Sequence, residues 1–173
     1  MEKGLPIIKW KLAVKSGSPE GCNDERLDGT FVVGAPAYLT SNISSEATEI
    51  GIHNGTKCVL HAIGYDSQAT QQRVNDAIAA CGVGEVVWVE TPNFIVVDVG
   101  QKPGLAGATR TAEGNVLLTL QPGESNCINM VSTLGERVRM SCVTVQDFDV
   151  DLAWAITRVH SSSSLLQSNT FSH

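Results

Sequence analysis

Two groups of side chains are of the types that bind metal ions. The nitrogen and sulfur donors are His53, Cys58 and His61. The carboxylates are Asp147, Asp149 and Asp151, which alternate along a segment that we expect to be extended. A histidine in a turn and another in a strand are most often surface or core residues, and alternating aspartates most often form a solvated acidic stretch. We therefore predict no metal site and assign no catalytic residue.

The loops that usually hold nucleotides are missing from the sequence. It contains no Gly-x-x-x-x-Gly-Lys-[Ser/Thr] phosphate loop and no Gly-x-Gly-x-x-Gly dinucleotide loop. It also lacks the Gly-x-Ser-x-Gly elbow used for acyl transfer, and the serine run at 161–164 has no strand, turn and helix around it. We therefore predict that this chain binds no cofactor and cannot hold ATP in the usual way.

The segment Asn54-Gly55-Thr56 is the best candidate for contacting a polar ligand. Asn-Gly tolerates positive φ, so a turn is predicted here. Such a turn exposes backbone N–H groups and short amide and hydroxyl side chains, which suit phosphate oxygens without net positive charge. The alternative for Asn42, Asn54 and Thr56 is plain turn and cap chemistry. The residues alone leave both readings open.

Composition and charge restrict the class of protein. Hydrophobic residues make up 42% and charged residues 17%, which is typical of a globular domain. The apolar runs are strand-sized, whereas a membrane-spanning helix needs roughly 18 apolar residues. The net charge of −6 has the wrong sign for a protein that holds phosphates mainly by electrostatics, so any nucleic-acid contact must be local.

The basic residues and the cysteines allow two further predictions. The lysines that cluster near the start are Lys3, Lys9, Lys11 and Lys15, and a solvated edge strand explains them best. The five cysteines are scattered without a Cys-x-x-Cys pair, which favours reduced and mostly buried thiols. The first residues do not form a secretory signal, so an intracellular protein is expected.

Hydrophobic periodicity predicts a strand-rich fold with one clear helix. The helix begins at Asp66 or Ser67, buries Val74 and Ile78 among others, and ends at Gly82. A glycine-rich loop is predicted over 100–114. The predicted strands are 7–14, 31–33, 37–40, 57–65, 85–90, 93–99, 115–120 and 137–145.

Three blocks, in this order, resemble the C-terminal part of Pif-type DNA helicases of superfamily one. Residues 34–43 are similar to the family's Gly-Ala-Pro-(apolar)-x-Leu-Thr-x-Asn-Ile strand and loop. Residues 51–61 are similar to its Gly-Leu-x-Asn-Gly-Thr turn and the strand after it. Residues 150–157 are similar to the apolar strand that leads into Thr-x-His-Lys-x-Gln-Gly. Each block alone is weak, but the ordered set across Asp28 to Thr157 is fairly specific.

The resemblance implies a fold and a division of the chain. The fold class is α/β and strand-rich, consisting of a partial second RecA-like motor domain with a small β-barrel-like insertion that touches single-stranded DNA. Residues 1–27 would be a lead-in strand and loop, residues 28–157 the helicase C-terminal region, and residues 158–173 a disordered serine-rich tail.

The resemblance also implies a function. The intact family uses ATP and magnesium, held between two motor domains, to move along single-stranded DNA. Its members act in DNA repair, recombination and telomere maintenance in the nucleus or mitochondria. This chain would supply only the DNA-facing half, would be inactive as a helicase or ATPase by itself, and could need a first motor domain as a partner. Weak single-stranded DNA binding is expected, with no membrane association. The residues expected to contact DNA are Thr40, Asn42, Asn54, Gly55, Thr56 and Thr157.

One departure from the family pattern limits the transfer of roles. After Thr157 the family has one residue and then His-Lys-x-Gln-Gly, whereas His160 comes one position late in this chain. A slip of one residue turns an extended side chain to the opposite face, so we assign no role to His160. Two alternatives remain, namely a small β-barrel protein-interaction module and a non-functional remnant of a mobile-element helicase gene.

Overall fold

The computed structural model describes residues 5–17, 24–102, 104, 107–134 and 137–153. Two α-helices, one 3-10 turn and eleven strands form in these segments. The helical elements are η1 (Glu25–Leu27), α1 (Ser45–Glu49) and α2 (Gln68–Ala80). The strands are β1 (Ile7–Lys11), β2 (Ala13–Ser16), β3 (Asp28–Phe31), β4 (Pro36–Leu39), β5 (Lys57–Gly64), β6 (Val86–Trp88), β7 (Phe94–Asp98), β8 (Leu117–Leu120), β9 (Gly123–Leu134), β10 (Arg137–Asp147) and β11 (Val150–Leu152).

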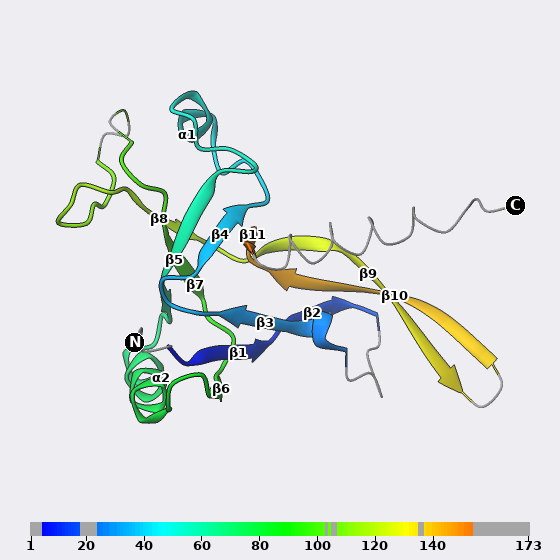
Figure 1. Ribbon diagram of the computed structural model, residues 1–173. Helices are drawn as coiled ribbons and strands as arrows, with labels where there is room; N and C mark the ends of the chain where they lie inside the picture. The colour runs from blue at the N-terminus through cyan, green and yellow to red at the C-terminus, as the bar shows by residue number, and fades with distance from the viewer. Residues whose placement is uncertain (1–4, 18–23, 103, 105–106, 135–136, 154–173) are drawn as a thin grey trace, which may run out of the picture.

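The largest sheet has five strands in the order β11-β4-β5-β7-β8, and all its neighbours are antiparallel. β4 pairs with β5 on one side and with β11 on the other (Figure 1). The register places Leu39 opposite Val150, and Ala37 opposite both Cys58 and Leu152. The sheet thus joins segments that lie far apart in the sequence.

Two smaller sheets complete the fold. In the first, β1 is the middle strand, antiparallel to β3 and parallel to β6. In the second, β10 pairs with both β2 and β9, and β9 and β10 make a long hairpin that extends away from the rest of the molecule (Figure 1). Leu12 separates β1 from β2, so one extended segment serves two sheets.

The core lies between these sheets and follows from the alternation of side chains along each strand. Ile8 and Trp10 of β1 are buried, as are Phe31 of β3 and Val97 of β7. The rings of Trp10 and Phe148 meet edge to face with their centroids 6.1 Å apart. That contact joins the β3-β1-β6 sheet to the end of β10.

The sequence predicts much of this arrangement. The expected strand-rich α/β class is confirmed, and α2 begins where Ser67 accepts a hydrogen bond from the Thr70 N–H. The prediction of a strand over 31–33 is wrong, because β3 ends at Phe31 and the chain turns through Gly34 at a φ of 77°. α1 and β9 were not predicted. The predicted tail, 158–173, lies outside the described residues.

Two expectations about side chains also need correction. Lys9 and Lys11 do not lie on an edge strand, because β1 is the middle strand of its sheet. Cys58 is buried as predicted, but Cys127 and Cys142 are exposed and pair as a disulfide across β9 and β10, with Cα atoms 5.7 Å apart. Within the described part of the chain, no helix is long and apolar enough to span a membrane.

Candidate nucleic-acid interface

The described parts of the three sequence blocks that resemble the helicase family include strands that lie side by side in the five-stranded sheet. Residues 34–43 contain β4, residues 51–61 lead into β5, and residues 150–157 begin with β11. β4 lies between the other two strands. Segments that are far apart in the sequence therefore form adjacent strands, and the loop after β4 contacts the turn before β5.

The turn before β5 is closed by its own backbone. The N–H of Gly55 donates to the carbonyl of Leu39 over 2.8 Å, and the N–H of Thr56 donates to the carbonyl of His53 over 3.0 Å. The N–H of His53 donates to the Thr56 hydroxyl oxygen over 2.9 Å. Gly55 has a φ of 86°, which is the left-handed conformation that favours glycine.

Asn42 ties the loop after β4 to this turn. Its side-chain oxygen accepts the N–H of Asn54 over 2.9 Å. The backbone N–H groups of residues 53–56 therefore all have acceptors within the protein. The expectation that exposed N–H groups of this turn bind phosphate oxygens is therefore wrong, because these groups donate hydrogen bonds within the turn and to its neighbours. Any contact must come from the side chains.

The same loop is also tied to the start of β11. The N–H of Thr40 donates to the Asp149 carbonyl over 3.0 Å, and the hydroxyl of Ser41 donates to the Asp149 carboxylate over 2.8 Å. Ser41 and Asp149 are 108 residues apart in the sequence. The ends of the three blocks are therefore held together by specific side-chain contacts as well as by strand pairing.

The structure brings five of the six predicted contact residues together. Thr40, Asn42, Asn54 and Gly55 are exposed, whereas Thr56 is half-buried and its hydroxyl is occupied within the turn. Thr157 lies outside the described residues. The groups that remain free to meet a ligand are the exposed amide and hydroxyl side chains, and their role in DNA binding stays a prediction.

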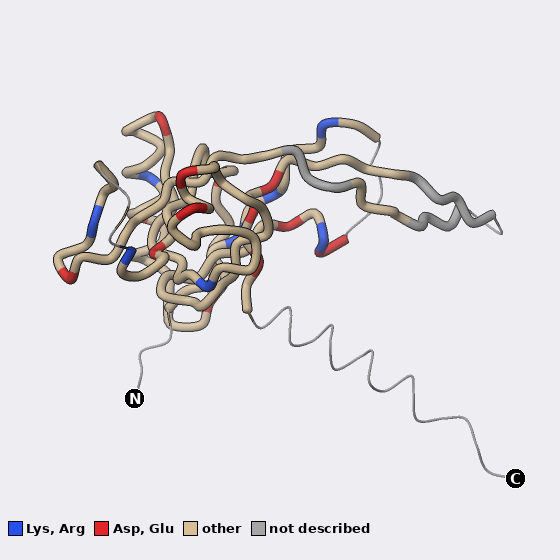
Figure 2. The backbone as a smooth tube through the Cα atoms, turned by 90° about the horizontal axis from the view of Figure 1, so that it is seen from above, with Lys and Arg blue, Asp and Glu red and all other residues tan. Residues whose placement is uncertain are grey.

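The charge around the turn is mixed. Lys57 follows it and is exposed, and the Lys102 ammonium lies 3.5 Å from the Gly51 carbonyl oxygen. Glu46 and Glu49 on α1 supply opposite charge nearby in the chain. Figure 2 shows acidic and basic residues interspersed over the molecule. A phosphate at the turn would therefore find local hydrogen-bond donors and a few cations, and no large positive field.

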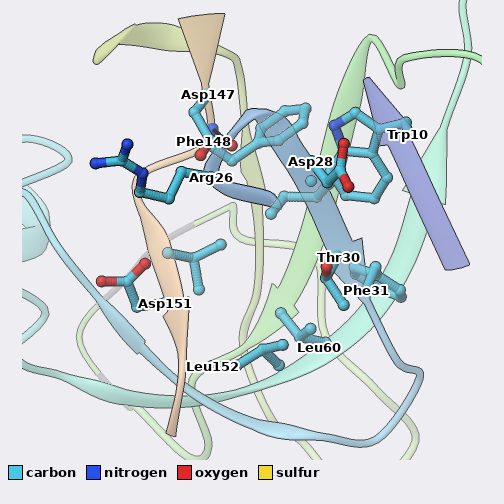
Figure 3. Close-up of a pocket in the computed structure, with 13 residues that line it drawn as sticks. Trp10, Arg26, Asp28, Thr30, Phe31, Leu60, Asp147, Phe148, Asp151 and Leu152 are labelled. Atoms are coloured by element: carbon cyan, nitrogen blue, oxygen red, sulfur yellow. Dashed lines mark hydrogen bonds between the residues drawn. The ribbon is translucent and has the colours of Figure 1, made fainter. Parts of the chain in front are cut away.

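A pocket of about 410 Å³ opens between β3 and the junction of β10 with β11 (Figure 3). Its walls include the Trp10 and Phe148 rings and the carboxylates of Asp28, Asp147 and Asp151. Burial is the largest cause that raises the pKa of Asp147, to about 6. The Phe148 N–H opposes this shift, and the charges of Asp151 and Asp149 add to it.

The pocket has features that strand patterning cannot predict. The indole N–H of Trp10 is buried without a hydrogen-bond partner among the described atoms. The Asp28 carboxylate forms an ion pair with the Lys11 ammonium at 2.5 Å. The described lining includes a carboxyl group whose pKa is raised to about 6 and the Thr30 hydroxyl, but no histidine, cysteine or serine. We assign no reaction to it.

The metal-binding alternatives are not supported by the geometry. Cys58 is buried and His61 is exposed on β5, because residues an odd number apart on a strand tend to face opposite sides. Asp147 accepts a hydrogen bond from the Phe148 N–H, while Asp149 accepts one from Ser41. Across the described segments, no three such side chains converge as metal ligands would.

Comparison with known proteins gives one distant likeness. No protein-family model matches the chain, and no curated protein matches its sequence. Among solved structures, the likeness is to Pif1 helicases. The Candida albicans Pif1 helicase is 14% identical over 87% of this chain and 30% of its own, with a TM-score of 0.43. Bacteroides Pif1 bound to single-stranded DNA is 15% identical over 88% of this chain and 26% of its own, with a TM-score of 0.40.

A Bacteroides Pif1 double mutant is 16% identical over 86% of this chain, with a TM-score of 0.39. The chain spans only 24% to 30% of the lengths of these helicases. These values describe a partial and distant likeness in fold. They do not show that this chain has the activity of the helicases.

Proposed function

We propose that this chain is the single-stranded-DNA-facing part of a Pif-type DNA helicase, and that it neither hydrolyses ATP nor unwinds DNA by itself. The observation that carries this proposal is the convergence of the three family-like blocks on β11, β4 and β5. Their motifs come from distant parts of the sequence, yet Leu39 pairs with Val150 and Asn42 binds Asn54. Chance matches to three short motifs have no reason to assemble in this way.

The finer assignment follows the same logic. β4 and β11 would be the remaining part of a second RecA-like motor domain, and the strands between them in sequence would include the barrel-like insertion. A first motor domain, supplied elsewhere, would bring the ATP and magnesium sites that this sequence lacks. A nuclear or mitochondrial location and roles in DNA repair, recombination and telomere maintenance belong to the same proposal.

The DNA contact would be made by side chains at the loop edge of the five-stranded sheet. Thr40, Asn42 and Asn54 are exposed and can donate hydroxyl or amide hydrogens to phosphate oxygens. Gly55 has no side chain, so the DNA backbone could approach the turn closely at this position. Since the chain carries a net charge of −6, binding should be weak and should not read base sequence.

The test is the affinity of the purified chain for a labelled single-stranded oligonucleotide at two salt concentrations, with ATP turnover measured in the same tube. Asn54→Asp keeps a residue that tolerates the turn but replaces an amide donor with a carboxylate. We expect roughly tenfold weaker binding, the size of one hydrogen bond to a charged group plus repulsion. The matched control is Asn75→Asp on the exposed face of α2, which adds the same charge away from the turn.

Equal affinities for Asn54→Asp and Asn75→Asp would remove the turn from the proposal. ATP hydrolysis by the chain alone would contradict the prediction that it is inactive. A folded chain that binds no oligonucleotide would favour the protein-interaction module or the gene remnant.

A further inference from the structure

Trp88 is unusually exposed for a residue of its type. It ends β6, an edge strand of three residues, and 52% of its surface is accessible. Large aromatic side chains are mostly buried, and exposed ones are often found where another molecule binds. The neighbouring Val86 on the same strand is also exposed.

Two lysines accompany this ring because of the strand register. β1 and β6 run parallel with Lys9 opposite Trp88, and Lys11 lies two residues farther on the same face of β1. The ammonium groups of Lys9 and Lys11 lie 5.9 Å and 5.0 Å from the centre of the Trp88 ring. Trp10, between the two lysines, faces the core and is 3% exposed. We call Lys9, Lys11 and Trp88 the aromatic face.

The charges on the aromatic face are partly compensated. Lys11 forms an ion pair with Asp28 at 2.5 Å, and Arg73 forms one with Glu90, two residues beyond Trp88. Lys9 has no carboxylate partner in the described part of the chain. Both ammonium groups make cation–π contacts with the Trp88 ring, so the face offers a partly exposed ring next to one cation that has no carboxylate partner among the described residues.

These features match one nucleotide of a single strand better than an apolar protein surface. A nucleotide has a flat base for the ring and a phosphate for the cation. An apolar partner would cover Trp88 and Val86 but would also remove Lys9 and Lys11 from water, which costs free energy when a cation gains no partner. We propose that the aromatic face is a stacking platform for a base of single-stranded nucleic acid, with Lys9 contacting the phosphate.

This inference rests on the proposed function for its ligand, but it uses a different sheet and a different part of the nucleotide. Stacking is insensitive to base identity because every base has a flat face. In a plot of the logarithm of the affinity against the logarithm of the salt concentration, one phosphate contact to a single strand should contribute a slope of only about −0.7. The platform would therefore add affinity to a chain that has little positive charge.

The decisive experiment compares oligothymidine with an abasic oligonucleotide of the same length and charge. The full chain should bind oligothymidine roughly tenfold more tightly, which is the value of about one stacked base. Trp88→Ala should bind both oligonucleotides equally, and Trp88→Phe should keep part of the preference because phenylalanine also stacks. The matched control is Val83→Ala, which shortens an exposed apolar side chain before β6 and should keep the full preference.

The outcomes separate this inference from the proposed function. If the full chain binds the two oligonucleotides equally, or if Trp88→Ala keeps the preference, the stacking platform is wrong. Asn54→Asp should weaken the binding of both oligonucleotides by the same factor, because both have the phosphates that the turn would contact. A preference that depends on Trp88 with no effect of Asn54→Asp would retain the platform and reject the turn. Tryptophan fluorescence quenching by oligothymidine, compared between the full chain and Trp88→Phe, decides the matter if Trp88→Ala does not fold.

Discussion

The turn and the aromatic face are built in opposite ways. At the turn, Asn42, Asn54 and Thr56 use hydrogen bonds within the protein to fix a polar loop whose exposed groups are small. On the aromatic face, strand register and cation–π contacts position Lys9 and Trp88, and about half of the Trp88 surface stays in solvent. The first surface suits phosphates and the second suits bases. Together, the two proposals predict that a chain with a net charge of −6 would bind nucleic acid through polar side chains and stacking, with little help from net charge.

The largest expected effect comes from the packing beneath the aromatic face. A Cβ atom added at Gly29 would lie 2.1 Å from the Trp10 ring, which is too close for a real contact. Since Trp10 is buried and cannot move freely, Gly29→Ala should lower the free energy of unfolding by about 3 kcal/mol. Urea denaturation measures this change. The base preference of the aromatic face should weaken with it.

Gly123→Ala is the matched control for this substitution. Its added Cβ would lie 3.4 Å from the Asp149 carboxylate, which is an ordinary contact distance. We expect a change in the free energy of unfolding of less than about 1 kcal/mol, as for most surface substitutions. Equal losses at the two glycines would show that Trp10 does not hold the sheet as described.

A smaller effect is expected at the pocket between β3 and the junction of β10 with β11. The pKa of Asp147 is raised to about 6, so the folded protein binds this proton more tightly than the unfolded chain, whose aspartates titrate near 4. The free energy of unfolding should therefore increase as the pH falls from about 7 to 4. Asp147→Asn should be about 2 kcal/mol more stable than the natural chain at pH 7, with the difference disappearing near pH 4.

Thermal unfolding of both proteins across this pH range tests the prediction. Asp151→Asn, in the same pocket but exposed, is the control and should show a much smaller gain. If Asp147→Asn is less stable than the natural chain at neutral pH, the carboxylate has a favourable partner that burial does not explain.

The smallest effect is expected at the turn itself. Asn42→Ala removes the acceptor for the Asn54 N–H and should cost about 1 kcal/mol, because water can replace the lost partner at this exposed site. Hydrogen exchange of the Asn54 amide should become faster. Asn42→Asp keeps a side-chain oxygen acceptor, so its exchange rate should stay near that of the natural chain while DNA binding weakens. Equal exchange in Asn42→Ala and the natural chain would show that the loop and the turn are not coupled.

Sequence patterns predict the parts of this fold that depend on neighbours in the chain. Alternation predicts β1 and most of β10, and the cap at Ser67 and the stop after α2 bound the helix. β9 has no clear alternation, and it becomes a strand because β10 pairs along nearly its whole length. The split at Leu12 depends on two different sheets, which local pattern does not encode.

In the candidate site, too, local features can be predicted from the sequence and contacts between distant segments cannot. The Asn-Gly pair predicts the turn at 54–55, and the structure confirms it. The use of the turn's N–H groups by Leu39 and Asn42 depends on contacts between distant segments, so the sequence could not show it. Trp88 stands in an apolar run that predicts a strand, but the face on which it lies depends on β1 as a partner.

The cysteine pair on the long hairpin affects how any titration of this protein should be prepared. Cys127 and Cys142 are both exposed, so they can exchange with thiols in the buffer. In air the thiols would oxidise to the disulfide, and in reductant the disulfide would be reduced to two thiols. A preparation without a fixed thiol potential would contain two species with different mobility in a non-reducing gel, and an affinity measured on it would average over both.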